Sequence, residues 1–292
     1  MIQIYQIQLT ADQVAQINAE GHDSVPAQTA KLAVQFWGAK KFKPEMIEYY
    51  SEAYRVDTDA LDEDFEIEII YNTNPSVEIE TDENLHEYIE FQVIDSVLTF
   101  NKTIRITSKK KLNIKVTHDD SLRYIETTDD AEIISLATMD LKSGKVKTRG
   151  SSKAGLTIKA NNFTFEGDDK SKVKLNLTSE NCTIISSGNS KLEALIETVN
   201  FSAILYQRAN ATIEGSGVDA KIDLDNNTQF NGKNFTLKTC NIISEIDGNA
   251  YLEVLEDITI EASGASSIYL YENPKIIINK FTDTCKLQKR VN

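Results

Sequence analysis

Residues 162–173 read Asn-Phe-Thr-Phe-Glu-Gly-Asp-Asp-Lys-Ser-Lys-Val, and residues 181–192 read Asn-Cys-Thr-Ile-Ile-Ser-Ser-Gly-Asn-Ser-Lys-Leu. The two stretches begin 19 residues apart, and Asn200-Phe-Ser-Ala-Ile begins a third copy after the same interval. A fixed period of this length indicates one small structural unit stacked on itself. The repetition extends, less regularly, from Gly150 to Tyr271, and this segment decides the fold.

Apolar and polar residues alternate within each repeat, as in Val173, Leu175 and Leu177. Alternation with a period of two is typical of a strand with one buried face. Gly, Asn and Asp interrupt the strands at 167–169 and 187–189, and these residues accept the left-handed backbone of tight bends. The repeat therefore predicts one coil of a parallel β-helix. An antiparallel sandwich or barrel also has short strands, but it leaves the 19-residue period unexplained.

Equivalent side chains of successive coils in a parallel β-helix stack about 4.8 Å apart. Two such ladders are predicted here. One is an inward ladder of Phe163, Cys182 and Phe201, and the other is a polar ladder, at a bend, of Asn162, Asn181 and Asn200.

The composition is that of a folded protein, with 292 residues, of which 40% are hydrophobic and 8% aromatic. The formal net charge of −14 disfavours binding to nucleic acid, whose phosphates are also negative. Cys182, Cys240 and Cys285 are odd in number and have no metal-like spacing, so we predict buried free thiols. No signal peptide is visible, and no segment approaches the roughly 20 apolar residues that cross a bilayer, which predicts no membrane insertion.

Residues 1–63 predict a small α+β module, with a strand at 1–9 and helices at about 11–19 and 45–54. The acidic segment Asp57-Thr-Asp-Ala-Leu-Asp-Glu-Asp64 is interpreted as a linker. Residues 64–292 are then a β-helix domain, with capping strands at about 64–118. The predicted fold class is therefore all-β, a parallel β-helix (solenoid) with a small N-terminal α+β module.

Two stretches carry a resemblance to a known family. They are the segment from Asn74-Pro-Ser-Val-Glu-Ile-Glu to Leu112-Asn-Ile-Lys-Val-Thr and the ending Ser263-Gly-Ala-Ser-Ser-Ile-Tyr-Leu-Tyr-Glu-Asn-Pro-Lys275. Over about residues 65–290 the chain resembles the family described as putative auto-transporter adhesin, head GIN domain. The resemblance implies a parallel β-helical fold without an assigned enzymatic activity, commonly on exported bacterial proteins.

The N-terminal module resembles small uncharacterised proteins of marine tailed phages. The resemblance lies in Ile4-Tyr-Gln-Ile-Gln-Leu-Thr10, in Lys41-Phe-Lys-Pro-Glu-Met46 and in Tyr49-Tyr50. A phage origin would also explain a β-helix without a signal peptide, because virion proteins leave the cell by lysis.

No catalytic residue, cofactor site or metal site is predicted. The histidines, His22, His86 and His118, are too far apart in sequence for a zinc motif, and the acidic segment at 57–64 lacks the features of a calcium loop. The pairs Asp129-Asp130 and Asp168-Asp169 resemble the paired carboxylates of polysaccharide-cleaving β-helices, but we interpret them as turn formers, because the repeats are short and have no long insert. An outward aromatic patch for sugar or protein contact is a further hypothesis, and its members are Tyr206, Tyr251, Tyr269 and Tyr271.

The sequence therefore predicts a non-enzymatic structural or adhesion protein, first of all a phage virion component with an outward-projecting β-helix. The alternative is a bacterial surface or periplasmic adhesin-like protein, and a β-helical carbohydrate-active enzyme is the third hypothesis. The predicted partners are other virion or assembly proteins, further copies of the chain (a trimer, for example), or a host surface glycan or protein. The predicted partner-binding residues are aromatic and basic, as interface anchors often are, and they are Trp37, Lys41, Phe42, Tyr49 and Tyr50.

Overall fold

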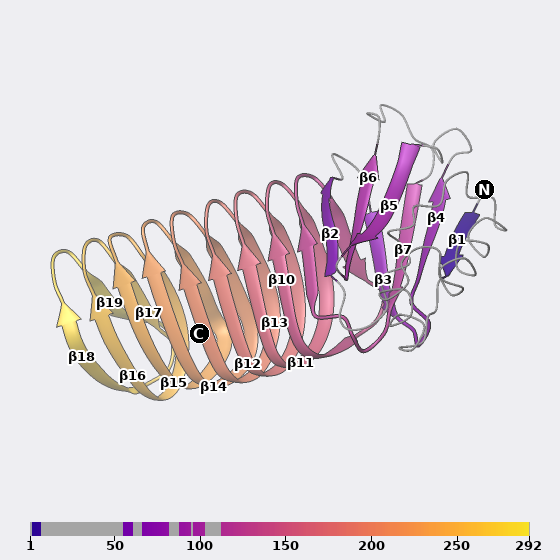
Figure 1. Ribbon diagram of the computed structural model, residues 1–292. Helices are drawn as coiled ribbons and strands as arrows, with labels where there is room; N and C mark the ends of the chain where they lie inside the picture. The colour runs from indigo at the N-terminus through magenta and orange to yellow at the C-terminus, as the bar shows by residue number, and fades with distance from the viewer. Residues whose placement is uncertain are drawn as a thin grey trace. The chain divides into compact units, whose positions relative to one another are not determined.

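The computed structural model describes residues 2–6, 55–60, 66–81, 88–94, 96–102 and 112–291. The regular elements of these residues are β-strands, and no α-helix occurs among them (Figure 1). The chain divides into two compact units, residues 1–139 and residues 140–292. The helices predicted at about 11–19 and 45–54 lie outside the described residues and stay predictions.

The first unit is built from short strands. They are β1 (Ile2–Gln6), β2 (Arg55–Ala60), β3 (Glu66–Tyr71), β4 (Ser76–Thr81), β5 (Ile89–Ile94), β6 (Val97–Lys102), β7 (Leu112–His118), β8 (Tyr124–Thr127) and β9 (Glu132–Ser135). Strand β4 pairs antiparallel with β1 and β7, and β5 pairs antiparallel with β6. Strand β3 pairs parallel with β7 and β9, and β2 pairs parallel with β6 and β8. This unit therefore mixes parallel with antiparallel strand pairs.

Apolar residues alternate with polar ones in β3 and β4, and the apolar ones form the buried face. Ile67, Ile69, Val77 and Ile79 are all buried. The interpretation of the acidic segment as a linker is wrong at its beginning, because residues 57–60 belong to β2. Four of the six residues of this strand are polar, so its sequence carries little of the apolar alternation that reveals β3 and β4.

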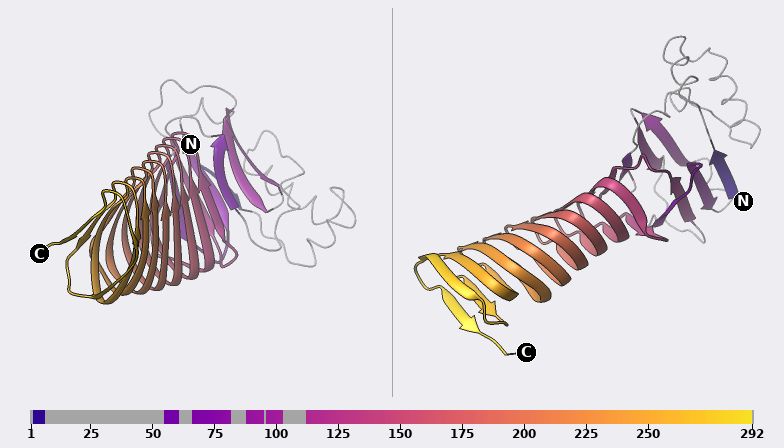
Figure 2. Two further views of the ribbon diagram at one scale, coloured as in Figure 1. Left: turned by 90° about the vertical axis from the view of Figure 1, so that its left-hand side faces the viewer. Right: turned by 90° about the horizontal axis from the view of Figure 1, so that it is seen from below.

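The second unit is a parallel β-solenoid in which each long strand winds through most of one coil (Figure 2). Its strands are β10 (Met139–Thr148, whose first residue belongs to the first unit), β11 (Lys153–Gly167), β12 (Lys172–Ser186), β13 (Lys191–Leu205), β14 (Asn210–Asp225), β15 (Gln229–Glu245), β16 (Asn249–Ala262), β17 (Ser267–Leu270), β18 (Lys275–Phe281) and β19 (Lys286–Lys289). From β11 to β14 the pairing is parallel and in register at an interval of 19 residues. The predicted β-helix is thereby confirmed.

The register changes in the later coils. Bulges interrupt the pairing of β14 with β15 between Thr212 and Glu214, and the pairing of β15 with β16 between Gly232 and Thr236. A bulge places one or more extra residues in one strand, so the constant interval of the sequence is lost there. This explains why the repeat becomes less regular after about residue 212.

The inward ladder is confirmed. Phe163, Cys182 and Phe201 stand opposite one another in β11, β12 and β13, and each is at most 2% exposed. The later coils continue the ladder with smaller or aliphatic side chains, namely Ala220, Cys240 and Ile258. This ladder forms part of the core on one side of the solenoid.

The asparagine ladder is also confirmed. Asn181 donates from Nδ2 to Oδ1 of Asn162 at 2.9 Å, and Asn200 donates in the same way to Asn181 at 2.8 Å. In each strand the asparagine belongs to a pair of consecutive outward residues, such as Asn161 and Asn162, which interrupts the alternation of buried and exposed positions. The chain turns a corner at this pair, so one continuous strand contributes to two faces of the solenoid.

Residues with a left-handed backbone mark the other bend of each coil. They include Gly150, Asp169, Gly188 and Gln207, again 19 residues apart. Oδ2 of Asp169 accepts the N–H of Gly150 at 3.0 Å, and Oε1 of Gln207 accepts the N–H of Gly188 at 2.8 Å. A Cβ at Gly188 would lie 2.7 Å from the backbone nitrogen of Asp169, so glycine is required there. The bend is thus fixed by glycine alternating with an acceptor side chain.

Candidate functional site

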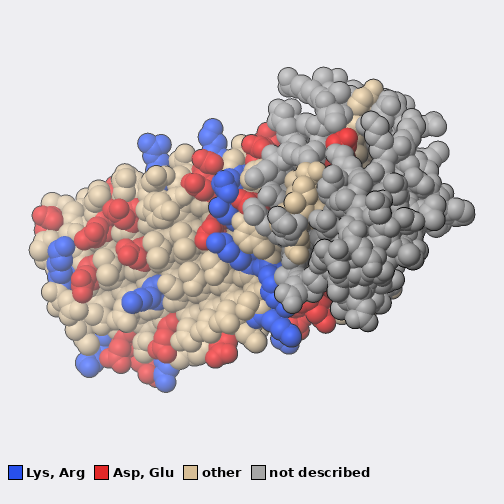
Figure 3. All heavy atoms as spheres, viewed as in Figure 1, with Lys and Arg blue, Asp and Glu red and all other residues tan. Residues whose placement is uncertain are grey.

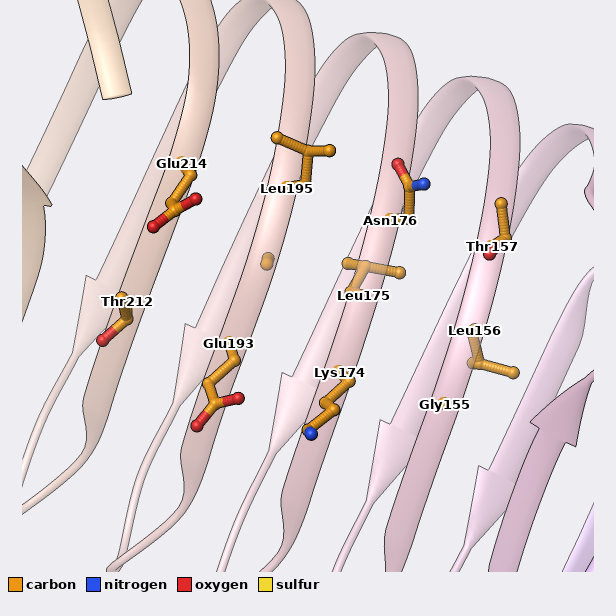
Figure 4. Close-up of a pocket in the computed structure, with 11 residues that line it drawn as sticks. Gly155, Leu156, Thr157, Lys174, Leu175, Asn176, Glu193, Leu195, Thr212 and Glu214 are labelled. Carbon is orange, nitrogen blue, oxygen red and sulfur yellow. The ribbon is translucent and has the colours of Figure 1, made fainter. Parts of the chain in front are cut away.

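A shallow groove of about 600 Å³ crosses the outward face of β11–β14 (Figure 4). Two outward rows of side chains line it, each with one residue from each coil. The first row is Gly155, Lys174, Glu193 and Thr212, and the second is Thr157, Asn176, Leu195 and Glu214. Between the rows lie the inward positions Leu156, Leu175 and Ala194, which are buried. The groove is thus an open surface feature that follows the stacking direction of the coils.

Glycine helps to shape the sheet beneath the groove. Gly155 places no side chain in the first row, at the β11 end. At the other end, a Cβ on Gly215 would lie only 2.2 Å from the backbone oxygen of Ile196, and the backbone of Gly215 has a φ of 109°. Strand β14 therefore lies closer to β13 at this point than any other residue type would allow.

The lining offers hydrogen-bonding groups, charges and one apolar surface. Thr157, Asn176 and Thr212 present hydroxyl and amide groups, and the side chain of Leu195 is 49% exposed. Oε1 of Glu214 accepts a hydrogen bond from Asn234 at 3.2 Å, which holds that carboxylate in place. Such a mixture suits a ligand with both polar groups and apolar surface, and it contains no arrangement of nucleophile and base.

Lysines form a ladder beside the groove. Lys153, Lys172 and Lys191 stand directly opposite one another in β11, β12 and β13, and all three are exposed. Each lysine follows a buried serine, namely Ser152, Ser171 or Ser190. The repeated Ser-Lys pair therefore alternates a small core residue with an outward cation.

Charge is distributed unevenly along the solenoid. Residues 140–191 contain ten Lys and Arg against five Asp and Glu, whereas residues 192–262 contain four against twelve. In Figure 3 the blue side chains gather towards the β10 end of the solenoid, and red ones are spread over the later coils. The early coils are thus locally basic in a chain whose formal net charge is −14.

The predicted tyrosine patch is only partly assembled. The rings of Tyr251 and Tyr269 stack with a centroid distance of 4.6 Å, and the guanidinium of Arg290 lies 4.7 Å from the centroid of Tyr269. Tyr271 is half-buried, just after β17, whereas Tyr206, 38% exposed, follows β13 at a bend. Arg290 already covers one ring of the pair, so the groove is the better candidate for a binding site.

The side chains of the paired aspartates form hydrogen bonds within the bends. Oδ1 of Asp168 accepts hydrogen bonds from the N–H of Asp169 and from the hydroxyl of Ser187, and Asp169 accepts the N–H of Gly150. Asp129 has a left-handed backbone with a φ of 53°, and its carboxylate accepts a hydrogen bond from Thr128. These carboxylates are engaged as turn formers, in agreement with the interpretation from sequence.

His118 is buried against the ring of Tyr71, with the two ring centroids 5.8 Å apart. Its Nδ1 donates to the backbone oxygen of Asp119 at 2.9 Å. Burial lowers the pKa of His118 below its ordinary value, although the backbone oxygen and the charge of Asp119 act in the opposite direction. Among the described residues no group of three or more His, Cys, Asp and Glu side chains could hold a metal ion.

The thiols differ in their surroundings. Cys182 and Cys240 are buried, and burial raises the pKa of both to about 12, whereas Cys285 is partly exposed. Because the thiolate is the reactive form, we expect Ellman's reagent to modify Cys285 alone in the folded protein and all three cysteines after denaturation. The Cys285→Ser variant should then show no reactive thiol before denaturation. Modification of Cys182 or Cys240 in the native state would contradict the burial of this ladder.

The predicted partner-binding residues, Trp37, Lys41, Phe42, Tyr49 and Tyr50, lie outside the described residues and stay predictions. The groove and the lysine ladder were not predicted from the sequence, although the Ser-Lys pair that marks the ladder recurs every 19 residues. None of the described residues belongs to a helix with the length and apolar composition needed to cross a bilayer.

Comparison with known proteins gives one family and several solved structures. The family described as putative auto-transporter adhesin, head GIN domain, matches residues 60–195 and 163–274. A putative adhesin from Parabacteroides merdae has 15% identity and a TM-score of 0.57, over 83% of this chain and 93% of that chain. A putative adhesin and a putative lipid binding protein from Parabacteroides distasonis each have 16% identity, with TM-scores of 0.53 and 0.51; the match covers 82% of this chain in both cases and 94% and 93% of theirs.

No curated protein matches the sequence. The similarity to the solved structures supports the solenoid fold, and the family match covers most of the chain. The chain belongs to the adhesin-like family described as putative auto-transporter adhesin, head GIN domain.

Proposed function

We propose that this protein is a non-enzymatic, adhesin-like protein of the bacterial surface, and that the groove over β11–β14 holds its ligand. The observation that carries the proposal is the groove itself, whose lining is fixed by hydrogen-bonded coils in constant register. A rigid, preformed surface loses little conformational entropy when it binds, which favours recognition of an extended ligand. Membership of an adhesin-like family supports the same function.

The absence of catalysis is part of the proposal. Asp168 and Asp169 are bound in the bend, and the groove combines hydroxyl, amide, lysine and glutamate side chains without a nucleophile and its base. We expect that polysaccharides incubated with the full chain gain no new reducing ends.

The sequence predicts a phage virion component first and a bacterial surface protein second. The solved structures reported above come from bacteria of the genus Parabacteroides, and none of them is described as a virion protein. The bacterial-surface alternative is therefore the better supported of the two. Residues 1–63, with Trp37, Lys41, Phe42, Tyr49 and Tyr50, are proposed to attach the protein to its partners.

An adherence assay tests the proposal. Beads coated with the full chain should adhere to surfaces coated with cells or with cell-surface glycans, and the Asn176→Trp variant should lose at least about 10-fold in affinity, which corresponds to about 1.4 kcal/mol. Asn176 is exposed in the middle of the groove, so an indole there fills the site without entering the core.

The matched control is Asn241→Trp, an exposed residue of β15 on the other outward face. Full adherence of Asn176→Trp beads, or equal loss with both variants, would show that the groove is not the binding site.

A further inference from the structure

The lysine ladder places like charges next to one another on the surface. Like charges directly opposite each other in a sheet are destabilising, and Lys172 has a lysine on each side, Lys153 and Lys191. Elsewhere in the early coils lysines are neutralised by neighbours, as in the pairs Lys145–Glu166 at 2.7 Å and Lys159–Asp140 at 3.8 Å.

Two lysines of the ladder, Lys172 and Lys191, are available to an outside ligand. Among the described residues, no carboxylate lies within ion-pair distance of Lys172 or Lys191, and both side chains are exposed. The nearby carboxylates of Asp168 and Asp169 are already held by hydrogen bonds within the bend. The cations at Lys172 and Lys191 therefore face solvent and form no ion pair with the described residues.

The ladder and the groove lie side by side. Along each strand the ladder position comes two residues before the first groove row, so Lys172 is followed on the same outward face by Lys174 and then by Asn176. A linear ligand placed along the groove would meet one ladder cation per coil, about every 4.8 Å. Its other edge would meet the hydroxyl, amide and aliphatic groups of the second row.

The lining also limits the class of anion. Glu193 and Glu214 stand in the groove, so a ligand there needs hydrogen-bond donors beside its negative charges, and a phosphodiester backbone has none. A polymer with one carboxylate and several hydroxyl groups on each ring fits better, because its hydroxyls can donate to these two glutamates and bond to Asn176 and Thr157. Sugars that carry carboxylates have this chemistry.

We infer that the lysine ladder and the groove together bind a linear carboxylated polysaccharide. The inference rests on the proposed function and names the ligand class of the same site. In this site Lys153, Lys172 and Lys191 bind the carboxylates of the ligand. The two rows of groove residues bind the sugar hydroxyls and the apolar faces of the rings.

Binding of alginate to the full chain tests the inference. The wild type should bind immobilised alginate, a polymer of uronates, and should bind it less tightly at high salt, since exposed charges are screened. The triple variant Lys153→Gln, Lys172→Gln, Lys191→Gln should bind at least about 10-fold more weakly, which is the sum expected for three exposed ion pairs.

The matched control is the triple variant Lys221→Gln, Lys233→Gln, Lys238→Gln. It changes the net charge by the same amount, at three exposed lysines of β14 and β15. This variant should bind alginate like the wild type. The ladder variant should also melt no lower than the wild type, because it removes like-charge repulsion, and this result separates a binding role from a structural one.

Other outcomes overturn the inference. They are failure of the wild type to bind alginate, equal loss with both triple variants, or tighter binding to neutral dextran, sulfated heparin or single-stranded DNA than to alginate. In each case the adherence assay with Asn176→Trp still decides on its own whether the groove is the adhesion site, so the two proposals can fail separately.

Discussion

Replacing Gly215 with alanine is expected to lower the free energy of unfolding by about 3 kcal/mol. The backbone of this residue has a φ of 109°, which residues with a side chain rarely adopt, and the added Cβ would lie 2.2 Å from the backbone oxygen of Ile196. The Cβ is fixed by the backbone of residue 215 and the oxygen belongs to the backbone of Ile196, so a change of rotamer cannot relieve the overlap. The strands would have to separate where β13 and β14 pair.

The matched control is Ser216→Ala, at the next residue of the same strand. Ser216 is exposed, so its replacement should change the free energy of unfolding by less than about 0.5 kcal/mol. Urea unfolding followed by far-ultraviolet circular dichroism compares the two variants. Equal midpoints for Gly215→Ala and wild type would show that the coils are not as close as the structure places them.

Truncating Phe201 to alanine should cost about 3–5 kcal/mol. Phe201 is 2% exposed. The centroid of its ring lies 5.0 Å from that of Phe235 and 6.1 Å from that of Phe230. Both partners lie in β15, two coils away. The rings can meet because β14, the coil between them, has the small residues Gly217 and Ala220 at inward positions. The lost ring would therefore leave a cavity that spans three coils.

Ile204→Ala is the control for this experiment. Ile204 is an apolar residue of the same strand, but its side chain is 40% exposed, so truncation should cost well under 1 kcal/mol. Similar midpoints in urea for the two variants would contradict the assignment of Phe201 to the core.

The solenoid could be predicted from sequence because its pattern is local and repeated. Asn162, Asn181 and Asn200 recur at one interval, and the stacking of a parallel coil is the physical reason for such an interval. The inward positions of Phe163 and Cys182 are predictable for the same reason, because these residues follow the asparagines of the repeat. Inward residues are constrained by packing, and so they keep the signal that sequence reasoning uses.

The candidate site could not be predicted in the same way. Outward residues such as Asn176 and Leu195 are free to vary, so the groove leaves no pattern in the sequence. The lysines at 172 and 191 do recur, but their mutual repulsion becomes apparent only when the register places them opposite each other. Bulges are equally hidden, since the extra residues near Gly232 leave the alternation on either side intact.

Because the register of β11–β13 is constant, the number of coils in the solenoid can change without a change in the side chains that each coil displays. After insertion or loss of one whole 19-residue coil, each inward, corner and bend residue still stands opposite an equivalent residue of the next coil. An insertion or deletion of another length would shift this register at every position. Each added coil would lengthen the stack by about 4.8 Å. Adding or removing whole coils would therefore change the reach of the segment in equal steps, while the groups displayed along it keep their spacing.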